Sequence, residues 1–281
     1  MASHIAPTTT DIFQTLLADA SASSDVFAVG LTEEPAAALV NALAGLDDPP
    51  TVRLPVTETV AKWLRRDFHL ASTAADLLAA ETLSLRVADG SFANQMVVTA
   101  DAVASILSTD EQTAGQATDD PEFVDSMRER CSEAWETAEP FDLRTPPRSR
   151  VYETLSDEID PAVEADYQAM LDAVETTRSN GYRTTDDDRF DEVELVLLAG
   201  AKHELQHYDL SRWGEDVGLA SKATFSRTKN RLEDQGLLTT EKVPIDIGRP
   251  RQRLVLDDRL RNVEAGDLPE AGRDVIESTV E

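Results

Sequence analysis

The segment from Arg189 to Leu256 constrains the fold more than any other part of the chain, because three amphipathic helical stretches are followed there by two strand-like runs. The second and third stretches are separated only by Gly218-Leu-Ala220, and glycine takes a positive φ without strain. Ser221 is suited to cap the third helix and Gly236 to end it. This order and spacing predict a winged helix-turn-helix.

The apolar positions of these three helices recur at helical spacing, so each helix has one face to bury. The second helix is expected at Asp209 to Val217, with Asp209 as its cap. The expected inner faces are Phe190, Val193, Leu197, Ala201 and Leu205 on the first helix, Leu210, Trp213 and Val217 on the second, and Phe225, Thr228 and Leu232 on the third.

The opposite face of the third helix, 221–235, presents Lys222, Ala223, Ser226, Arg227 and Asn230. Arginine pairs with guanine and asparagine with adenine, while serine and lysine suit phosphate, which a helix N-terminus also favours. We therefore expect this helix to enter the major groove of double-stranded DNA. Arg227 and Asn230 would select bases, and Lys222 would contribute mainly to affinity.

The two strand-like runs, 237–243 and 251–256, predict a β-hairpin wing, whose part near the DNA we place at 243–253. Its tip and return strand carry Arg249, Arg251 and Arg253, which, like Lys222, are expected mainly to set affinity. Arginines are attracted by the enhanced negative potential of a narrow minor groove, so this wing is expected in the minor groove. A winged helix that contacts protein instead of DNA is an alternative for the same segment.

Charge is distributed unevenly along the chain. The 54 acidic and 26 basic side chains give a formal charge of −28, yet residues 221–262 hold ten basic and six acidic residues, a net of +4, so the remainder carries −32. Many acids with only five lysines are typical of salt-loving archaea, where carboxylates maintain hydration and molar salt screens their repulsion. The basic segment marks the expected contact with DNA.

Residues 1–108 alternate between strand-like and helical patterns, which predicts an α/β layer domain. We expect strands at 25–31, 51–56, 83–87 and 95–99, and helices at 33–46 and 58–81. A metabolite effector would bind at the carboxyl ends of the strands, near Gly30, Thr32, Thr57, Asp89 and Ser91. The sequence has no dinucleotide fingerprint, phosphate-binding loop or catalytic triad, so we expect no cofactor. Sensing and dimerisation stay open as roles for this domain.

Residues 109–185 are expected to form a helical connector, beginning with a polar segment, 109–120. A helix from Pro121 carries Phe123, Met127, Cys131 and Trp135 on one stripe. A helix after Pro161 carries a second stripe, Val163, Tyr167, Met170, Leu171 and Val174. This second stripe packs either within the chain or against another copy, and a homodimer is expected from it. The DNA-binding domain is placed at 186–262 and an acidic tail at 263–281.

An enzyme is the alternative from another class. His203-Glu-Leu-Gln-His207 fits H-E-x-x-H, which on one helix places two imidazoles for zinc, with Glu204 as general base in a metallohydrolase. Here the motif runs into the expected cap at Asp209, and His4 and His69 are far away in sequence. A single cysteine, Cys131, excludes a Cys-based metal site. We expect no metal and no catalysis.

Leu232-Glu-Asp-Gln-Gly-Leu-Leu238 and Gly248-Arg-Pro-Arg251 resemble the winged-helix half of prokaryotic transcription regulators, and the acidic architecture resembles the haloarchaeal TbsP family, similar in plan to TrmB-type sugar-responsive regulators. The resemblance implies a sequence-specific regulator of metabolic genes that binds promoter DNA. TrmB-type sensor domains resemble the phospholipase-D fold, but the His-x-Lys motif of those enzymes is missing here. With no signal-peptide pattern and no membrane span, the expected location is cytoplasmic.

Overall fold

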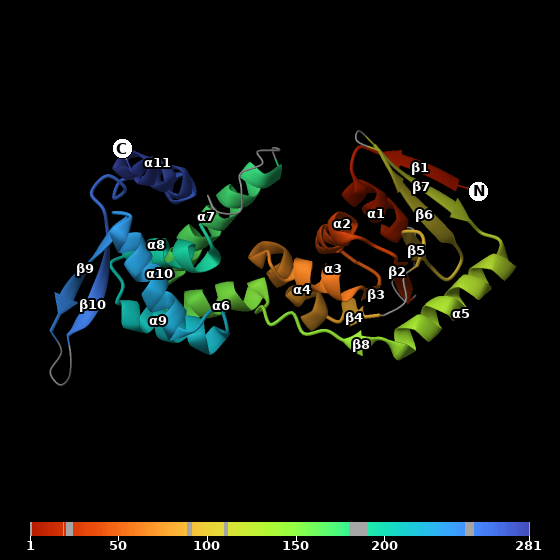
Figure 1. Cartoon of the computed structure of the whole chain (residues 1–281), viewed down its shortest axis with the longest axis horizontal. Coiled ribbons are helices and arrows are strands. Elements are labelled where there is room, and N and C mark those ends of the chain that lie inside the picture. Colours follow the sequence, from red (N-terminus) through yellow and green to blue (C-terminus); the bar gives the residue numbers. More distant parts are fainter. Residues whose placement is uncertain are drawn as a thin grey trace. The chain divides into compact units, whose positions relative to one another are not determined.

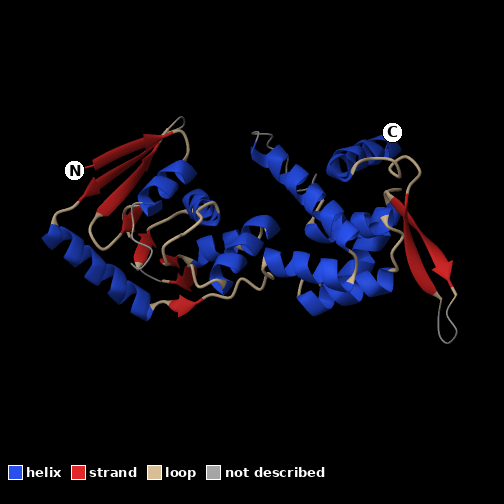
Figure 2. Ribbon diagram, turned by 180° about the vertical axis from the view of Figure 1, so that it is seen from behind, coloured by secondary structure: helices blue, strands red, loops and turns tan. Residues whose placement is uncertain are grey.

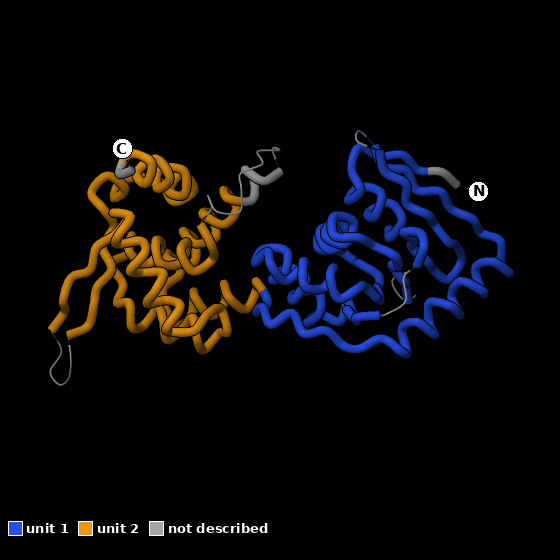
Figure 3. Tube along the Cα trace, viewed as in Figure 1, with its two compact units in different colours: residues 1–147 blue, residues 148–281 orange. Residues whose placement is uncertain are grey.

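The chain folds into two compact units, residues 1–147 and 148–281, in a computed structural model (Figure 3). The described residues are 2–18, 20, 25–88, 92–109, 112–179, 190–244 and 250–280. Unit 1 is a mixed α/β domain, and unit 2 is helical with one β-hairpin (Figure 2). This is the fold class that the sequence predicts.

The sheet of unit 1 contains, within the described residues, eight strands in the order β1-β7-β6-β5-β2-β3-β4-β8. Strands β2, β3 and β4 run parallel, and the other pairings are antiparallel. The strands are β1 (Ala2–Ala6), β2 (Val26–Val29), β3 (Val52–Val56), β4 (Leu83–Val87), β5 (Met96–Val98), β6 (Val103–Ser108), β7 (Thr113–Thr118) and β8 (Glu139–Pro140).

Helices cover both faces of this sheet (Figure 1). One face packs against α1 (Thr9–Ala18), α2 (Glu33–Ala44), α3 (Glu58–Leu64) and α4 (Phe68–Ala79). The other face packs against α5 (Pro121–Thr137), where Val124, Cys131 and Trp135 are buried against strand residues such as Phe27. Burial raises the pKa of the Cys131 thiol to about 11, so this cysteine is an inert core residue, as its spacing predicts.

Several predictions for unit 1 were wrong in detail. The polar segment 109–120 is not a separator, because 113–118 form β7, which is paired on both sides by β6 and β1. With α5 and β8, it extends unit 1 past the expected end at Ser108 to Pro147. The expected helix 58–81 is two helices, with Asp67 capping α4. Phe123 is 48% exposed instead of lying on the inner stripe of α5.

Unit 2 is built around the winged helix-turn-helix. Its elements are α6 (Arg148–Glu158), α7 (Pro161–Ser179), α8 (Glu192–Lys202), α9 (His207–Val217), α10 (Lys222–Asp234), β9 (Leu238–Val243), β10 (Arg251–Leu256), a 3-10 helix η1 (Ala265–Asp267) and α11 (Leu268–Val280). The expected inner faces of α9 and α10 are buried, as are all the expected positions on α8 except the half-buried Leu205 in the loop after it.

The close crossing of α9 and α10 depends on glycine. A Cβ at Gly214 would lie 2.3 Å from two ring carbons of Phe225, whose side chain is completely buried. Gly218 ends α9 at a φ of +86°, the left-handed conformation predicted for the turn. Asp209, the expected cap of α9, lies instead in its first turn, because the helix begins two residues earlier with Gln206 as its N-cap.

The apolar stripe on α7 is buried inside unit 2. Val163, Tyr167 and Met170 have no exposed surface, and α7 packs against α6, α8, η1 and α11. Residues expected to form an acidic tail supply part of this cover, since Leu268 and Val275 are buried. The stripe is therefore not available to a second copy. Among the described residues, the helices are too short or too polar to cross a membrane.

Candidate nucleic-acid interface

Helix α10 presents the polar face that its sequence predicts. Its N-cap Ser221 accepts a hydrogen bond from the Thr224 amide at 3.1 Å, which fixes where the helix begins. All five expected contact residues of this helix are exposed: Lys222, Ala223, Ser226, Arg227 and Asn230. Because the inner face is fixed by Phe225, Thr228 and Leu232, these side chains project together from one side.

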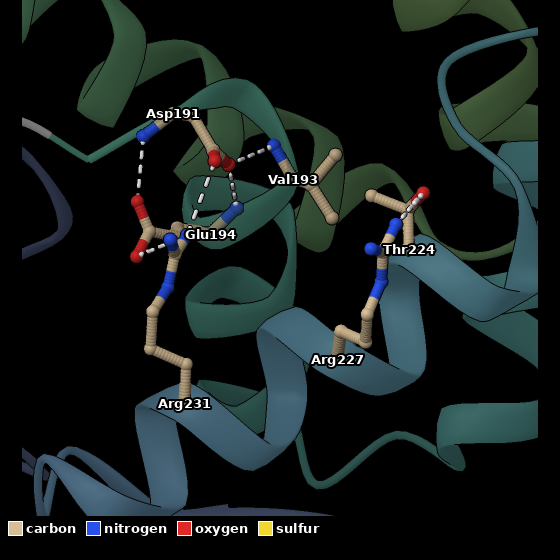
Figure 4. Close-up of polar contacts among 6 residues, drawn as sticks. All are labelled: Asp191, Val193, Glu194, Thr224, Arg227 and Arg231. Atoms are coloured by element: carbon tan, nitrogen blue, oxygen red, sulfur yellow. Dashed lines mark hydrogen bonds and ion pairs between the residues drawn. The ribbon is translucent and has the colours of Figure 1, made fainter.

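Arg227 is the least constrained cation of this face. Its Nη2 donates a 3.4 Å hydrogen bond to Thr224 Oγ1, and no carboxylate of the described residues lies within ion-pair distance of it (Figure 4). Among the same residues, the Asn230 amide has no hydrogen-bond partner. Both side chains are free to bind an external group.

An ion-pair cluster joins α10 to α8, the first helix of the winged helix-turn-helix (Figure 4). Asp191 and Glu194 form a reciprocal capping box at the start of α8, with the Asp191 amide donating to Glu194 Oε2 at 2.8 Å. Arg231 Nη2 lies 3.0 Å from Glu194 Oε1 and 3.2 Å from Asp191 Oδ2. The sequence reasoning missed this anchor, although the Asp191-x-x-Glu194 spacing before an apolar run signals a capping box.

Lys222, at the start of α10, is held by a carboxylate of α9. Its Nζ lies 2.6 Å from Glu215 Oε2, and its amide donates to Glu215 Oε1 at 3.4 Å. The hydrogen bond raises the pKa of Lys222 and lowers that of Glu215. Both groups are therefore charged at neutral pH and pair across the helix-turn-helix turn.

The arginines of β10 are held in the same way, by the first turn of α9 and by the residues between α8 and α9. Arg251 Nη1 donates to Asp209 Oδ1 at 3.1 Å and to Gln206 Oε1 at 3.2 Å, and its guanidinium lies 4.3 Å from the ring centroid of Tyr208. Arg253 Nη1 lies 3.5 Å from Glu204 Oε2. The strands pair from Arg251 opposite Val243 to Leu256 opposite Leu238. Arg249, the third expected wing residue, lies outside the described residues.

The H-E-x-x-H segment does not form one helical face. His203 is the C-cap of α8, and His207 is the first residue of α9, with Glu204 between them at a φ of +54°. His203 Nε2 instead lies 2.7 Å from Asp166 Oδ2 of α7. Among the described residues, no group of three His, Cys, Asp or Glu side chains is arranged to hold a metal ion.

Three of the five expected effector residues of unit 1 lie at the carboxyl ends of its parallel strands. Gly30, Thr32 and Thr57 follow β2 and β3, whose parallel pairing places their carboxyl ends together. Gln95 Nε2 donates to Thr32 Oγ1 at 3.4 Å, while Thr57 caps α3. Asp89 and Ser91 lie outside the described residues. These contacts already engage both threonines within the fold.

Comparison with known families accounts for nearly the whole chain. A family described as "Transcriptional regulator TbsP-like, N-terminal" matches residues 1–146, and one described as "Transcriptional regulator TbsP-like, C-terminal HTH domain" matches residues 147–273. The chain belongs to the TbsP-like transcriptional regulators. The two matches of this TbsP-like regulator meet where the structure divides, and they confirm the resemblance to TbsP-like regulators; the haloarchaeal origin stays a prediction.

No curated protein matches the regulator. Among solved structures, it is similar to TrmBL2, "an archaeal chromatin protein", at 18% identity over 50% of this chain and 54% of that one, with a TM-score of 0.35. It therefore spans about half the length of TrmBL2. It is also similar to the phospholipase D family member Nuc from Salmonella typhimurium, at 13% identity over 50% of this chain and 97% of that one, with a TM-score of 0.35.

Proposed function

We propose that this TbsP-like regulator binds promoter DNA sequence-specifically, with α10 in the major groove and the β9–β10 hairpin, whose expected tip includes Arg249, in the minor groove. The main support is that Arg227 and Asn230 are exposed on the outward face of α10. Neither side chain has a carboxylate partner among the described residues. The guanidinium of Arg227 is thus not engaged by any carboxylate of the described residues. Its geometry suits a bidentate contact with guanine.

The proposal also covers the organism in which the regulator works and the genes that it controls. An excess of 54 acids over 26 bases supports a halophilic archaeal origin, and the DNA target implies action in the cytoplasm. Metabolic genes are the proposed targets. A metabolite effector is proposed at the sheet edge that holds Gly30, Thr32 and Thr57, since the carboxyl ends of parallel strands are where such ligands bind.

We also propose that the regulator is a homodimer that pairs through β1. This strand is the edge of the sheet, and none of the residues of β1, β6 and β7 is Asp, Glu, Lys or Arg. Ile5 of β1 is 69% exposed and Leu107 of β6 is 55% exposed. Both lie opposite Ala114 of β7, on the face of the sheet away from α1. Edge strands normally carry charges that prevent pairing. An uncharged edge lets two acidic copies meet without repulsion, antiparallel about a two-fold axis.

Genome-wide occupancy mapping in high-salt cells tests DNA recognition. We expect enrichment at promoters of metabolic genes and a pseudo-palindromic site with half-sites about one helical turn apart. Arg227→Ala is expected to abolish the preference for this site in vitro while leaving the melting temperature unchanged, because the side chain is exposed. Absence of promoter enrichment, or a site preference that survives Arg227→Ala, contradicts the proposal.

Sedimentation in molar KCl tests the dimer. Ile5→Glu and Ile5→Lys each place like charges near each other across the two-fold axis of the β1 pair and are expected to give monomers. Phe123→Glu is the matched control, because Phe123 is also exposed but lies on α5. A dimer that persists in both strand variants places the interface elsewhere.

A further inference from the structure

Three of the four described cations that we place near DNA are already paired with carboxylates. Lys222 pairs with Glu215, Arg251 with Asp209 and Arg253 with Glu204, at 2.6, 3.1 and 3.5 Å. The fourth cation, Arg227, is the one assigned to base recognition. Phosphate-contacting cations and base-contacting cations are thus treated differently by the fold.

Stability does not explain these pairs. All six side chains are at least one-third exposed, and ion pairs exposed to solvent contribute little to stability because water and salt screen them. Glu204 also adopts a φ of +54°, which is uncommon for a residue with a Cβ. Its place in the sequence is one that glycine would fill with less strain, yet it supplies a carboxylate to Arg253.

We propose that Glu204, Asp209 and Glu215 are positioning residues of the DNA interface that set its salt dependence. In free protein they hold Arg253, Arg251 and Lys222 against α9 and the short segment that precedes it. When DNA binds, each cation exchanges its carboxylate for a phosphate. The inference rests on the proposed function, since it assumes that these cations meet phosphates.

The exchange changes the ion balance of binding. Cations that bind phosphate release condensed counterions from DNA, and this release makes affinity fall steeply with salt. A carboxylate left beside a phosphate repels it and attracts cations from solution, which offsets part of the counterion release. Each acid therefore weakens binding at low salt and makes its decline with salt shallower. The affinity of such an interface for DNA falls less between low and molar salt, and molar salt is the solvent for which an acidic chain is suited.

The test uses the full chain with two DNA duplexes, one of random sequence and one carrying the selected operator. Affinity is measured by fluorescence anisotropy in KCl from about 0.2 to about 3 M, because a slope against salt is well determined only over a wide range of salt. The triple variant Glu204→Gln, Asp209→Asn and Glu215→Gln is compared with a charge-matched triple, Asp25→Asn, Glu58→Gln and Asp258→Asn. The control acids pair with Arg53, Lys62 and Arg261, which are not placed at the interface.

We expect the first triple variant to bind both duplexes about tenfold tighter than the control at the lowest salt and to converge with it at the highest. Its slope of log affinity against log salt becomes more negative by about one in total, because a difference of about tenfold has to disappear over a roughly fifteenfold range of salt, and each single variant shows about a third of the change. A merely structural role leaves this slope unchanged.

Parallel slopes for the two triple variants overturn the inference. Its failure is distinguishable from failure of the proposed function, because the slope is measured on random DNA, whereas the proposed function requires preference for the operator. Steep slopes without operator preference reject only the latter, and no binding to either duplex at any salt rejects both.

Discussion

Arg231 Nη2 of α10 lies 3.0 Å from Glu194 Oε1 of α8, and the Glu194 side chain is only 8% exposed (Figure 4). Burial raises the pKa of Glu194, and the neighbouring Asp191 raises it further, while Arg231 lowers it. The pair therefore joins the start of α8 to the helix proposed to contact DNA, and Arg231 offsets part of the cost of burying this carboxylate.

Arg231→Met removes the cation from this carboxylate. We expect the free energy of unfolding to fall by about 1–2 kcal/mol, less than for a fully buried pair because half of Arg231 is exposed. Urea unfolding in molar KCl measures the change. Arg261→Met is the control, since Arg261 pairs with the exposed Asp258, and its effect should stay within about 0.5 kcal/mol. Equal losses for Arg231→Met and Arg261→Met would show that the pair with Glu194 stabilises the fold no more than an exposed ion pair does.

Gly214→Ala places a methyl group against the buried ring of Phe225. We expect a loss of about 1–3 kcal/mol, because α9 and α10 must separate. Gly266→Ala is the matched control, since the nearest atom to its added Cβ is 4.0 Å away. Phe225→Leu combined with Gly214→Ala should recover part of the loss. Thermal melting of Gly214→Ala, Phe225→Leu, their double variant and Gly266→Ala checks this, and no recovery would place the strain elsewhere.

Glu192 gives the unfolding free energy a predictable pH dependence. Burial raises its pKa to about 7 from 4.5, with Asp191 and Glu194 adding repulsion. The folded state thus binds the proton more tightly than the unfolded chain, so this contribution to stability is complete below about pH 4.5 and is lost as pH rises to 7. Relative to wild type, Glu192→Gln should gain up to about 3 kcal/mol between pH 4.5 and 8. Urea unfolding of both proteins across this range is the measurement, and a constant difference contradicts the prediction.

Asn230→Ala is expected to relax base choice at one position of the operator without changing the salt dependence. A bidentate contact between asparagine and adenine contributes about 1–3 kcal/mol of discrimination. Competition between operators with single base changes measures it. Ser226→Ala serves for comparison, because a hydroxyl assigned to phosphate should affect all sequences alike. Uniform weakening by Asn230→Ala would remove Asn230 from the base-contacting set.

The sequence by itself determined the winged helix. The inner faces of α9 and α10, the cap at Ser221, the positive φ of Gly218 and the hairpin all follow from periodicity and local backbone preferences, which act over a few residues. The exposed face of α10 followed as well, since burying Phe225 and Leu232 fixes what lies opposite.

Only the tertiary structure decided which groups meet across the chain. Strand β7 has weak strand signals of its own and exists because β1 and β6 pair with it on both sides. The stripe of α7 is ambiguous in sequence, because an apolar face buries equally well against its own chain or a second copy, and here η1 and α11 help to cover it. The carboxylates that hold Lys222, Arg251 and Arg253 are likewise invisible to local patterns, since the partners of the two arginines lie more than forty residues away.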